Sequence, residues 1–187
     1  AVYSSDTLTI TNKYEPEKTS LNGTKVWEDN SNQDGKRPSS IIVHLYADGK
    51  GTGKQVKVTP TEAAGNTWSY SFTGLDKYNA GKEIKYTVKE EITDTVAKTV
   101  YTSSVDGLTI TNSYIPETTS IQGEKHWDDG NNQDHKRPQS ITVKLLADGK
   151  VTKTSVITPD SNGFWKYSFT DLPVYANGHK ITYTVEE

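Results

Sequence analysis

The sequence contains no cysteine, no methionine and no long run of apolar residues. Without cysteine there can be no disulfide bonds and no thiolate metal sites, so any covalent stabilisation has to come from other side chains. No segment approaches the roughly 20 apolar residues that cross a bilayer as a helix, so we expect no membrane partner. No signal-peptide pattern is present either, which indicates a mature fragment or an excised piece.

The sequence also has no excess of positive charge. Its formal net charge is −3 and its Lys and Arg residues do not cluster, so we expect no nucleic-acid partner. No Gly-rich phosphate loop and no repeated Ser-His-Asp arrangement is present, which makes an enzyme with turnover and a bound cofactor remote. The four histidines lack metal-ligand spacing and are expected to be scattered surface residues: His44, His126, His135 and His179.

Two polar segments need a separate assessment. Residues 30–35 faintly resemble a calcium loop, but Ile41 stands at the closing acidic position. The second copy of the pattern contains Gly130 and His135, so we favour a hydrogen-bonded surface loop over a calcium site, and we predict no metal site. The basic pairs in 36–38 and 136–138 lie next to acidic residues and are expected to form surface ion pairs of little energetic value.

What the chain does contain is a repeat. Residues 19–50 and 119–150 align without a gap at an offset of 100, with 20 of 32 positions identical. A fixed period of this length indicates tandem modules, and 187 residues then divide into two domains of fewer than a hundred residues each. We expect a complete domain over 18–115 and a second domain over 116–187 without its last strand. Residues 1–14 match the closing strand of a preceding repeat.

Almost every patterned segment predicts a β-strand. Short runs rich in Val, Ile, Thr, Tyr and Trp alternate in polarity, and Asp-Gly at 48–49 and 148–149 is typical of a tight hairpin turn. About seven such strands per repeat, each with one apolar face, predict an all-β fold of two-sheet sandwiches. No window shows helical periodicity.

Strand alternation places one lysine on an apolar face. Lys25 shares its face with Trp27, Glu90 lies on the inner face of a later strand, and Asn112 lies on the inner face of the last one. A charged amine or carboxylate buried without a partner costs several kcal/mol, so these three groups are expected to meet. The simplest interpretation is a buried Lys–Glu pair that is hydrogen-bonded to the asparagine.

The alternative interpretation is chemical. Burial favours the neutral forms of both a lysine and a glutamic acid, and a neutral lysine is a nucleophile. A protonated Glu90 could polarise the Asn112 carbonyl and pass protons to departing ammonia, which would leave a Lys25–Asn112 isopeptide bond. The two residues are 87 positions apart. By the chain-entropy account used for disulfides, such a link is worth on the order of 4–5 kcal/mol.

The motifs, in this order, resemble those of the Cna B-type repeat of Gram-positive surface proteins. They are GTKVWEDNSNQDGKRP and GEKHWDDGNNQDHKRP, then ADGK, then YTVKEE or YTVEE, then TITNKY or TITNSY. The resemblance covers essentially the whole chain. It implies a prealbumin-like, reverse-immunoglobulin sandwich, an extracellular, cell-wall-anchored location and often an autocatalytic Lys–Asn bond promoted by an acid. On that basis the lysines are Lys25 and Lys125, the acids are Glu90 and Glu187, and the asparagines are Asn112 and Asn12. Alternation places the neighbouring Glu91 and Glu186 outside.

The second lysine, acid and asparagine are divided between the two ends of the chain: Lys125 and Glu187 lie in the last repeat and Asn12 lies near the start. Asn12 cannot easily reach Lys125 across a whole domain, so we expect residues 1–14 to complete the 116–187 domain of a neighbouring molecule, head to tail, with a possible Lys125–Asn12 link. The equally open alternative is a long repeat array divided at an arbitrary register.

Three function classes follow from the sequence. The first is a structural stalk whose partners are adjacent repeats of the same protein, and which projects a separate ligand-binding domain. The second is a module that binds host matrix protein or carbohydrate directly, and the third is a turnover enzyme. Near-identical tandem copies that differ in exposed residues favour the stalk over the other two classes, because a stalk needs shape and stiffness rather than one unique surface.

Overall fold

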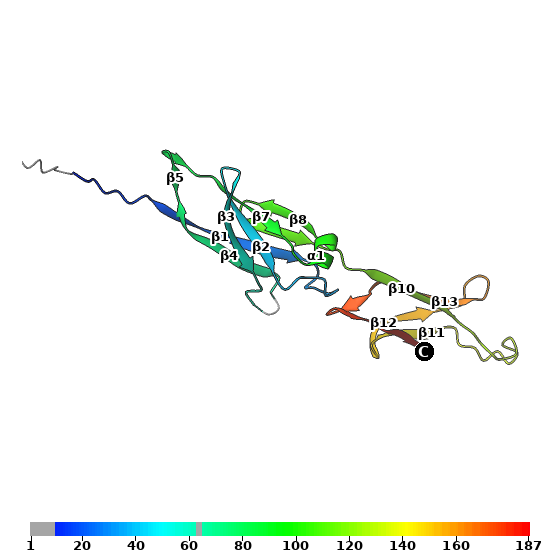
Figure 1. Ribbon diagram of the computed structural model, residues 1–187. Coiled ribbons are helices and arrows are strands. Elements are labelled where there is room, and N and C mark those ends of the chain that lie inside the picture. Colours follow the sequence, from blue (N-terminus) through cyan, green and yellow to red (C-terminus); the bar gives the residue numbers. More distant parts are fainter. Residues whose placement is uncertain (1–9, 63–64) are drawn as a thin grey trace, which may run out of the picture.

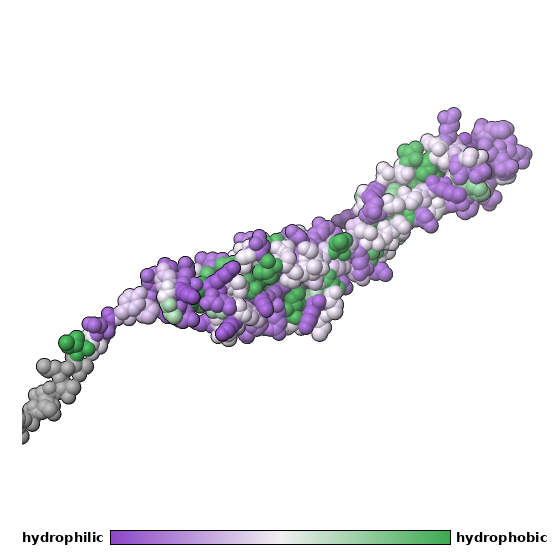
Figure 2. Space-filling view, turned by 90° about the horizontal axis from the view of Figure 1, so that it is seen from above, coloured by the Kyte–Doolittle hydropathy of each residue, from purple (hydrophilic) through white to green (hydrophobic). Residues whose placement is uncertain are grey.

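The computed structural model describes residues 10–62 and 65–187, and it confirms the predicted all-β class. Two β-rich domains follow one another along the chain and lie end to end (Figure 1). The space-filling view shows the same elongated arrangement, with apolar residues in small separate patches on the face that it presents (Figure 2). Among the described helices, none has the length and apolar character needed to cross a membrane.

The first domain is a sandwich of a four-stranded and a three-stranded sheet. The larger sheet has the order β4-β1-β9-β8, with β1 antiparallel to β4 and parallel to β9. The smaller sheet has the order β3-β2-β7. The strands are β1 (Lys18–Glu28), β2 (Ile41–Ala47), β3 (Lys50–Val58), β4 (Thr67–Asp76), β7 (Tyr86–Glu91), β8 (Thr102–Asp106) and β9 (Thr109–Ser113).

The core of this domain lies between the two sheets, and most of its strand residues follow the alternation that the sequence predicts. In β4, Trp68, Tyr70 and Phe72 are buried while the residues between them are exposed. Trp27 from β1 packs on Trp68 with ring centroids 5.0 Å apart. Other buried members are Ile41, Val43, Leu45, Val58, Leu75, Val88, Ala97, Tyr101 and Ile110.

The expectation of a chain without helix was wrong at one place. Helix α1 (Thr95–Val100) connects β7 to β8 and packs Ala97 into the core. Asp94 caps it, because its side chain accepts a hydrogen bond of 2.8 Å from the Ala97 backbone N–H. Six residues are too few to show a helical period, so an aspartate at the N-cap was the only available signal.

The second domain repeats this plan with fewer strands among the described residues. One sheet contains β10 and β13, and the other has the order β12-β11-β16. The strands are β10 (Thr118–Lys125), β11 (Ile141–Ala147), β12 (Lys150–Ile157), β13 (Trp165–Pro173) and β16 (Tyr183–Glu186). Each domain also has a two-residue hairpin ladder: β5 (Tyr78–Asn79) with β6 (Lys82–Glu83), and β14 (Tyr175–Ala176) with β15 (His179–Lys180).

The edge of β10 differs from that of β1. Within the described part of the chain β10 pairs with β13 alone, whereas β1 pairs with both β4 and β9. Of the segment matched to a closing strand, residues 1–9 lie outside the described residues. Residues 10–17 have no regular secondary structure and extend from the first domain on the side opposite the second (Figure 1).

Candidate cross-linking site

The alternation of β1 turns Lys25 into the core of the first domain. Its side chain has no solvent exposure, and its Nζ lies 3.9 Å from the centroid of the Trp27 ring. The ammonium donates a hydrogen bond of 2.9 Å to the Val26 carbonyl. Across the parallel pairing with β9, Lys25 is aligned with Ile110 and Trp27 with Asn112. The lysine therefore lies beside the last strand of the domain.

The structure brings the three predicted residues together. Lys25 Nζ lies 3.7 Å from Glu90 Oε1, and Asn112 Nδ2 donates a hydrogen bond of 2.9 Å to the same oxygen. Asn112 is fully buried, and only 4% of the Glu90 side chain is exposed. The neighbouring Glu91 faces outward, as predicted, and contacts His44 at 2.6 Å.

One detail differs from the expected hydrogen bonding. The Asn112 nitrogen, and not its carbonyl oxygen, faces Glu90, and the carbonyl Oδ1 is buried without a hydrogen-bond partner. The nitrogen that would leave as ammonia is therefore next to the acid. Polarisation of the carbonyl by Glu90 would require the carboxamide to rotate, and an unsatisfied buried oxygen favours any rearrangement that gives it a donor.

Burial raises the neutral fraction of the Lys25 amine above that of an ordinary lysine. Desolvation lowers the pKa of Lys25 to about 8, against the opposing effect of the Glu90 carboxylate, and the positive charge of Arg37 lowers this pKa further. With a pKa of about 8, about a tenth of the amine is neutral at pH 7. The neutral form is the one that can attack a carbonyl carbon.

Ser103 is a member of the site that the sequence reasoning missed. Its hydroxyl donates a hydrogen bond of 2.7 Å to Glu90 Oε2, the oxygen that does not face Asn112. Ser103 is aligned with Asn112 in the β8–β9 hairpin. The turn at Gly107 sets this alignment, so it was the sequence signal that could have predicted Ser103 beside Asn112. This contact holds the carboxyl group in one orientation.

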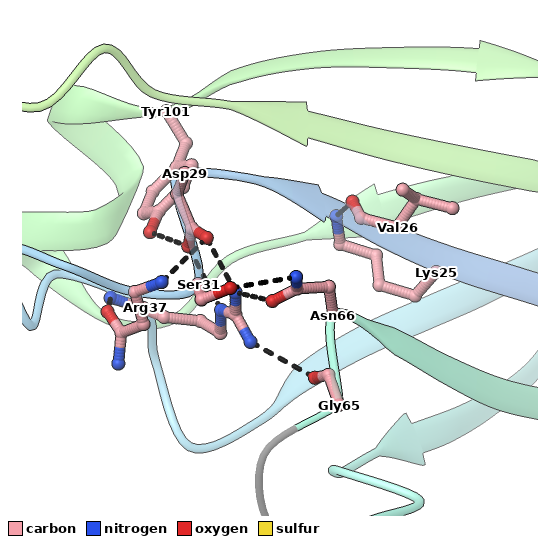
Figure 3. Close-up of polar contacts among 9 residues, drawn as sticks. Lys25, Val26, Asp29, Ser31, Arg37, Gly65, Asn66 and Tyr101 are labelled. Atoms are coloured by element: carbon pink, nitrogen blue, oxygen red, sulfur yellow. Dashed lines mark hydrogen bonds and ion pairs between the residues drawn. The ribbon is translucent and has the colours of Figure 1, made fainter.

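The expectation of a surface ion pair at 36–38 was wrong for Arg37. Its side chain is 9% exposed and that of Asp29 is 1% exposed. Arg37 donates two hydrogen bonds to the Asp29 carboxylate, of 2.9 and 2.5 Å, and others to the Gly65 carbonyl and to Asn66 Oδ1 (Figure 3). The loop folds over the end of the core, which places the guanidinium 5.5 Å from the Trp27 ring centroid. Sequence spacing alone could not show this closure.

The buried carboxylate of Asp29 is fully satisfied. Tyr101 donates its hydroxyl proton to Asp29 Oδ2 at 2.6 Å, and the Asn32 backbone N–H donates to Oδ1 at 2.9 Å. Burial alone would raise the pKa of Asp29, but the hydrogen bonds from Arg37, Tyr101 and Asn32 bring it below its ordinary value. The equivalent pair in the second domain, Arg137 and Asp129, is more exposed, as the sequence predicted.

The second domain contains a related but open arrangement. Lys125 Nζ lies 2.7 Å from Glu187 Oε2 and 4.6 Å from the centroid of the Trp127 ring. The lysine side chain is 29% exposed and the glutamate 48%. Asn12 is exposed in the segment at the far end of the first domain, so the fold does not bring it to Lys125 within one chain (Figure 1).

With this geometry established, comparison with known proteins is informative. The sequence profile of the Cna protein B-type domain matches residues 21–113 and 121–187. The chain belongs to the Cna B-type domain family. The boundaries of the two matches agree with the two units of the fold, and we refer to them below as the first and second B-type domains.

Two relatives extend this result. The collagen adhesin of Staphylococcus aureus is 52% identical over 181 residues, which is 96% of this chain and 15% of that protein. The crystal structure of two B repeat units of the collagen-binding protein of Staphylococcus aureus matches with a TM-score of 0.78 and 49% identity, over 93% of this chain and 45% of that one. The chain thus spans a small part of the length of the collagen adhesin that it matches, and it resembles the two B repeat units in both sequence and fold.

Proposed function

We propose that this chain is a stalk segment of a surface adhesin and that its first B-type domain is stiffened by an autocatalytic Lys25–Asn112 isopeptide bond. The observation that carries the proposal is the buried trio in the core, where two side-chain nitrogens face one carboxylate oxygen. A simple buried ion pair would not need a buried carboxamide beside it with an unpartnered carbonyl.

The reaction consumes no external reagent. The neutral Nζ of Lys25 attacks Cγ of Asn112, an amide C–N bond forms, and the bond from Cγ to Nδ2 breaks. One proton from the amine moves to the departing nitrogen, which leaves as ammonia. Glu90 is placed to carry this proton, because its Oε1 already lies 2.9 Å from Nδ2. The first domain reacts once, so the process is self-modification without turnover.

The link has a mechanical consequence because of the sheet order. Lys25 lies on the first strand of the domain and Asn112 on the last, and the two strands are parallel neighbours. Tension that enters along β1 and leaves along β9 would pass through the covalent bond instead of through the hydrogen bonds of the sandwich. A stalk that projects a separate ligand-binding domain from the cell wall needs this property.

Intact-protein mass tests the proposed bond. The parent chain should be lighter than its sequence mass by one ammonia, and Glu90→Ala should retain the full mass. Glu91→Ala is the matched control, because this neighbouring carboxylate faces outward and should leave the loss unchanged. An unshifted parent mass would refute the bond.

The relative named collagen adhesin favours a second candidate, direct binding of host matrix protein by these modules. Immobilised collagen separates the two functions. A stalk segment should give no saturable binding, whereas a binding module should saturate. A carbohydrate array applies the same test to sugar ligands.

We further propose that the open edge of β10 accepts a strand of the β9 type, with Asn12 of a neighbouring molecule presented to Lys125. The half-exposed Lys125–Glu187 pair and the TITNKY segment that carries Asn12 support this arrangement. A denaturing gel should then show covalent ladders that disappear in Asn12→Ala. A monomeric band alone would contradict a link between molecules.

A further inference from the structure

The connection between the two B-type domains is held by a buried side chain. Asp34 lies in the loop after β1 and is only 4% exposed. Its Oδ2 accepts a hydrogen bond of 2.8 Å from the Tyr114 hydroxyl and one of 2.9 Å from the Glu117 backbone N–H. Both donors belong to the segment between β9 and β10, so the linker is fixed to the body of the first domain.

A second contact joins the same loop to the second domain. The Gly178 N–H, in the hairpin between β14 and β15, donates a hydrogen bond of 2.9 Å to the Gln33 carbonyl. Gly35 and Gly178 then meet backbone to backbone: a Cβ added to Gly35 would lie 2.7 Å from the Gly178 Cα. Such a distance is too short for any side chain at position 35, so this close approach requires glycine.

The corresponding loop of the second domain has the same conformation but not the same residue. His135 stands where Gly35 stands in the first copy, and both have positive φ, 53° and 66°. The turn hydrogen bond is retained as well, from His135 N to Asn132 O and from Gly35 N to Asn32 O, each of 2.9 Å. The loop therefore accepts histidine without changing its shape.

We propose that the loop Gln33–Gly35 and the Gly178 hairpin form an orienting interface between consecutive B-type domains, and that residue 35 determines how closely they dock. In the second domain the corresponding loop is 133–135. It fits the hairpin of a following B-type domain that is equivalent to β14–β15. Asp134 retains the linker-binding carboxylate, but the His135 side chain prevents the close backbone contact. An array of these repeats then alternates a tightly oriented junction with a looser one.

This interface does not depend on the isopeptide bond. The substitution Gly35→His tests it, because it places at position 35 the histidine that the second domain has at the equivalent position 135. The chain has no cysteine, so spin labels can be attached at Lys57→Cys and Thr154→Cys, which are exposed strand positions in different domains. Double electron–electron resonance on the parent should give one narrow distance distribution. Gly35→His should lose this narrow peak and give a broad distribution.

Two controls separate docking from misfolding. Gly81, the first-domain counterpart of Gly178, has a φ of +79°, so a side chain there strains the backbone, as it does at Gly35 with its φ of +66°. No atom lies within 4 Å of a Cβ added to Gly81, so Gly81→His blocks no contact and should keep the narrow peak. Asp34→Ala should broaden the distribution, whereas Asp134→Ala should not. The intact mass of each variant should equal that of the parent after allowing for the substitution, which separates this test from that of the Lys25–Asn112 bond. A parent that is already broad, or a Gly35→His variant as narrow as the parent, would overturn the proposal.

Discussion

At the scale of single residues, the environment decides what a lysine can do. Lys25 and Lys125 occupy equivalent positions and each lies over a tryptophan ring next to a glutamate. Lys25 is sealed from water, however, and Lys125 is not. Desolvation therefore lowers the pKa of the first lysine, which is the lysine that we propose as the nucleophile within one chain.

The rate of bond formation should depend on pH through this lysine. Because burial lowers the pKa of Lys25 to about 8, the neutral fraction rises about tenfold per pH unit below that value and then levels off. We expect the loss of ammonia after refolding to accelerate from pH 6 to about 8 and to change little above it. Acid-quenched mass spectrometry at successive times measures this rate. A rate that is independent of pH over this range would exclude Lys25 as the titrating nucleophile.

The two arginine–aspartate pairs give a second prediction at this scale. Arg37→Ala leaves the carboxylate of Asp29 buried with its principal partner removed, so the first domain should lose about 3–5 kcal/mol of unfolding free energy. Arg137→Ala, at the exposed counterpart, should cost about 1 kcal/mol or less. Chemical denaturation in a background that lacks the cross-link (Asn112→Ala) measures both. Equal losses would show that burial does not distinguish the pairs.

At the scale of secondary-structure elements, the period of two in the sequence predicted most of the fold. It placed Trp68, Tyr70 and Phe72 inward on β4, and the contrast of Glu90 and Glu91 on β7 followed from the same alternation. Features that depend on how loops and hairpins pack in the folded domain could not be predicted from this alternation. Helix α1 is too short for a period, and the burial of Arg37 depends on a loop that folds over Trp27. Ser103 reaches Glu90 only through hairpin register.

The cap of α1 provides the prediction for this scale. Asp94→Ala removes the acceptor for the Ala97 N–H and should destabilise the first domain by about 1 kcal/mol. Asp94→Ser retains a capping oxygen and should stay near the parent stability. Urea unfolding followed by tryptophan fluorescence measures both variants, again in the Asn112→Ala background. If Asp94→Ser lost as much unfolding free energy as Asp94→Ala, the stabilisation would come from the negative charge of Asp94 and not from its capping hydrogen bond.

At the scale of the whole molecule, the domains are arranged as rods in series (Figure 1). In the proposed stalk, stiffness has two sources: a covalent bond between neighbouring terminal strands within the first domain, and the glycine contact that orients the second domain on it.

Pulling a single molecule from its ends tests the mechanical part. Unfolding of the first domain should not release the 86 residues between Lys25 and Asn112, because the bond bypasses them. In Asn112→Ala the same segment should extend by roughly 300 Å. Optical tweezers or atomic force microscopy resolves this step, and a parent that shows it would lack the bond.

The most direct test of the central claim is tandem mass spectrometry of a protease digest of the parent chain. The account predicts a branched peptide in which the β1 fragment containing Lys25 is joined to the β9 fragment containing Asn112, with one ammonia lost. Separate, unmodified fragments for the two strands would contradict it.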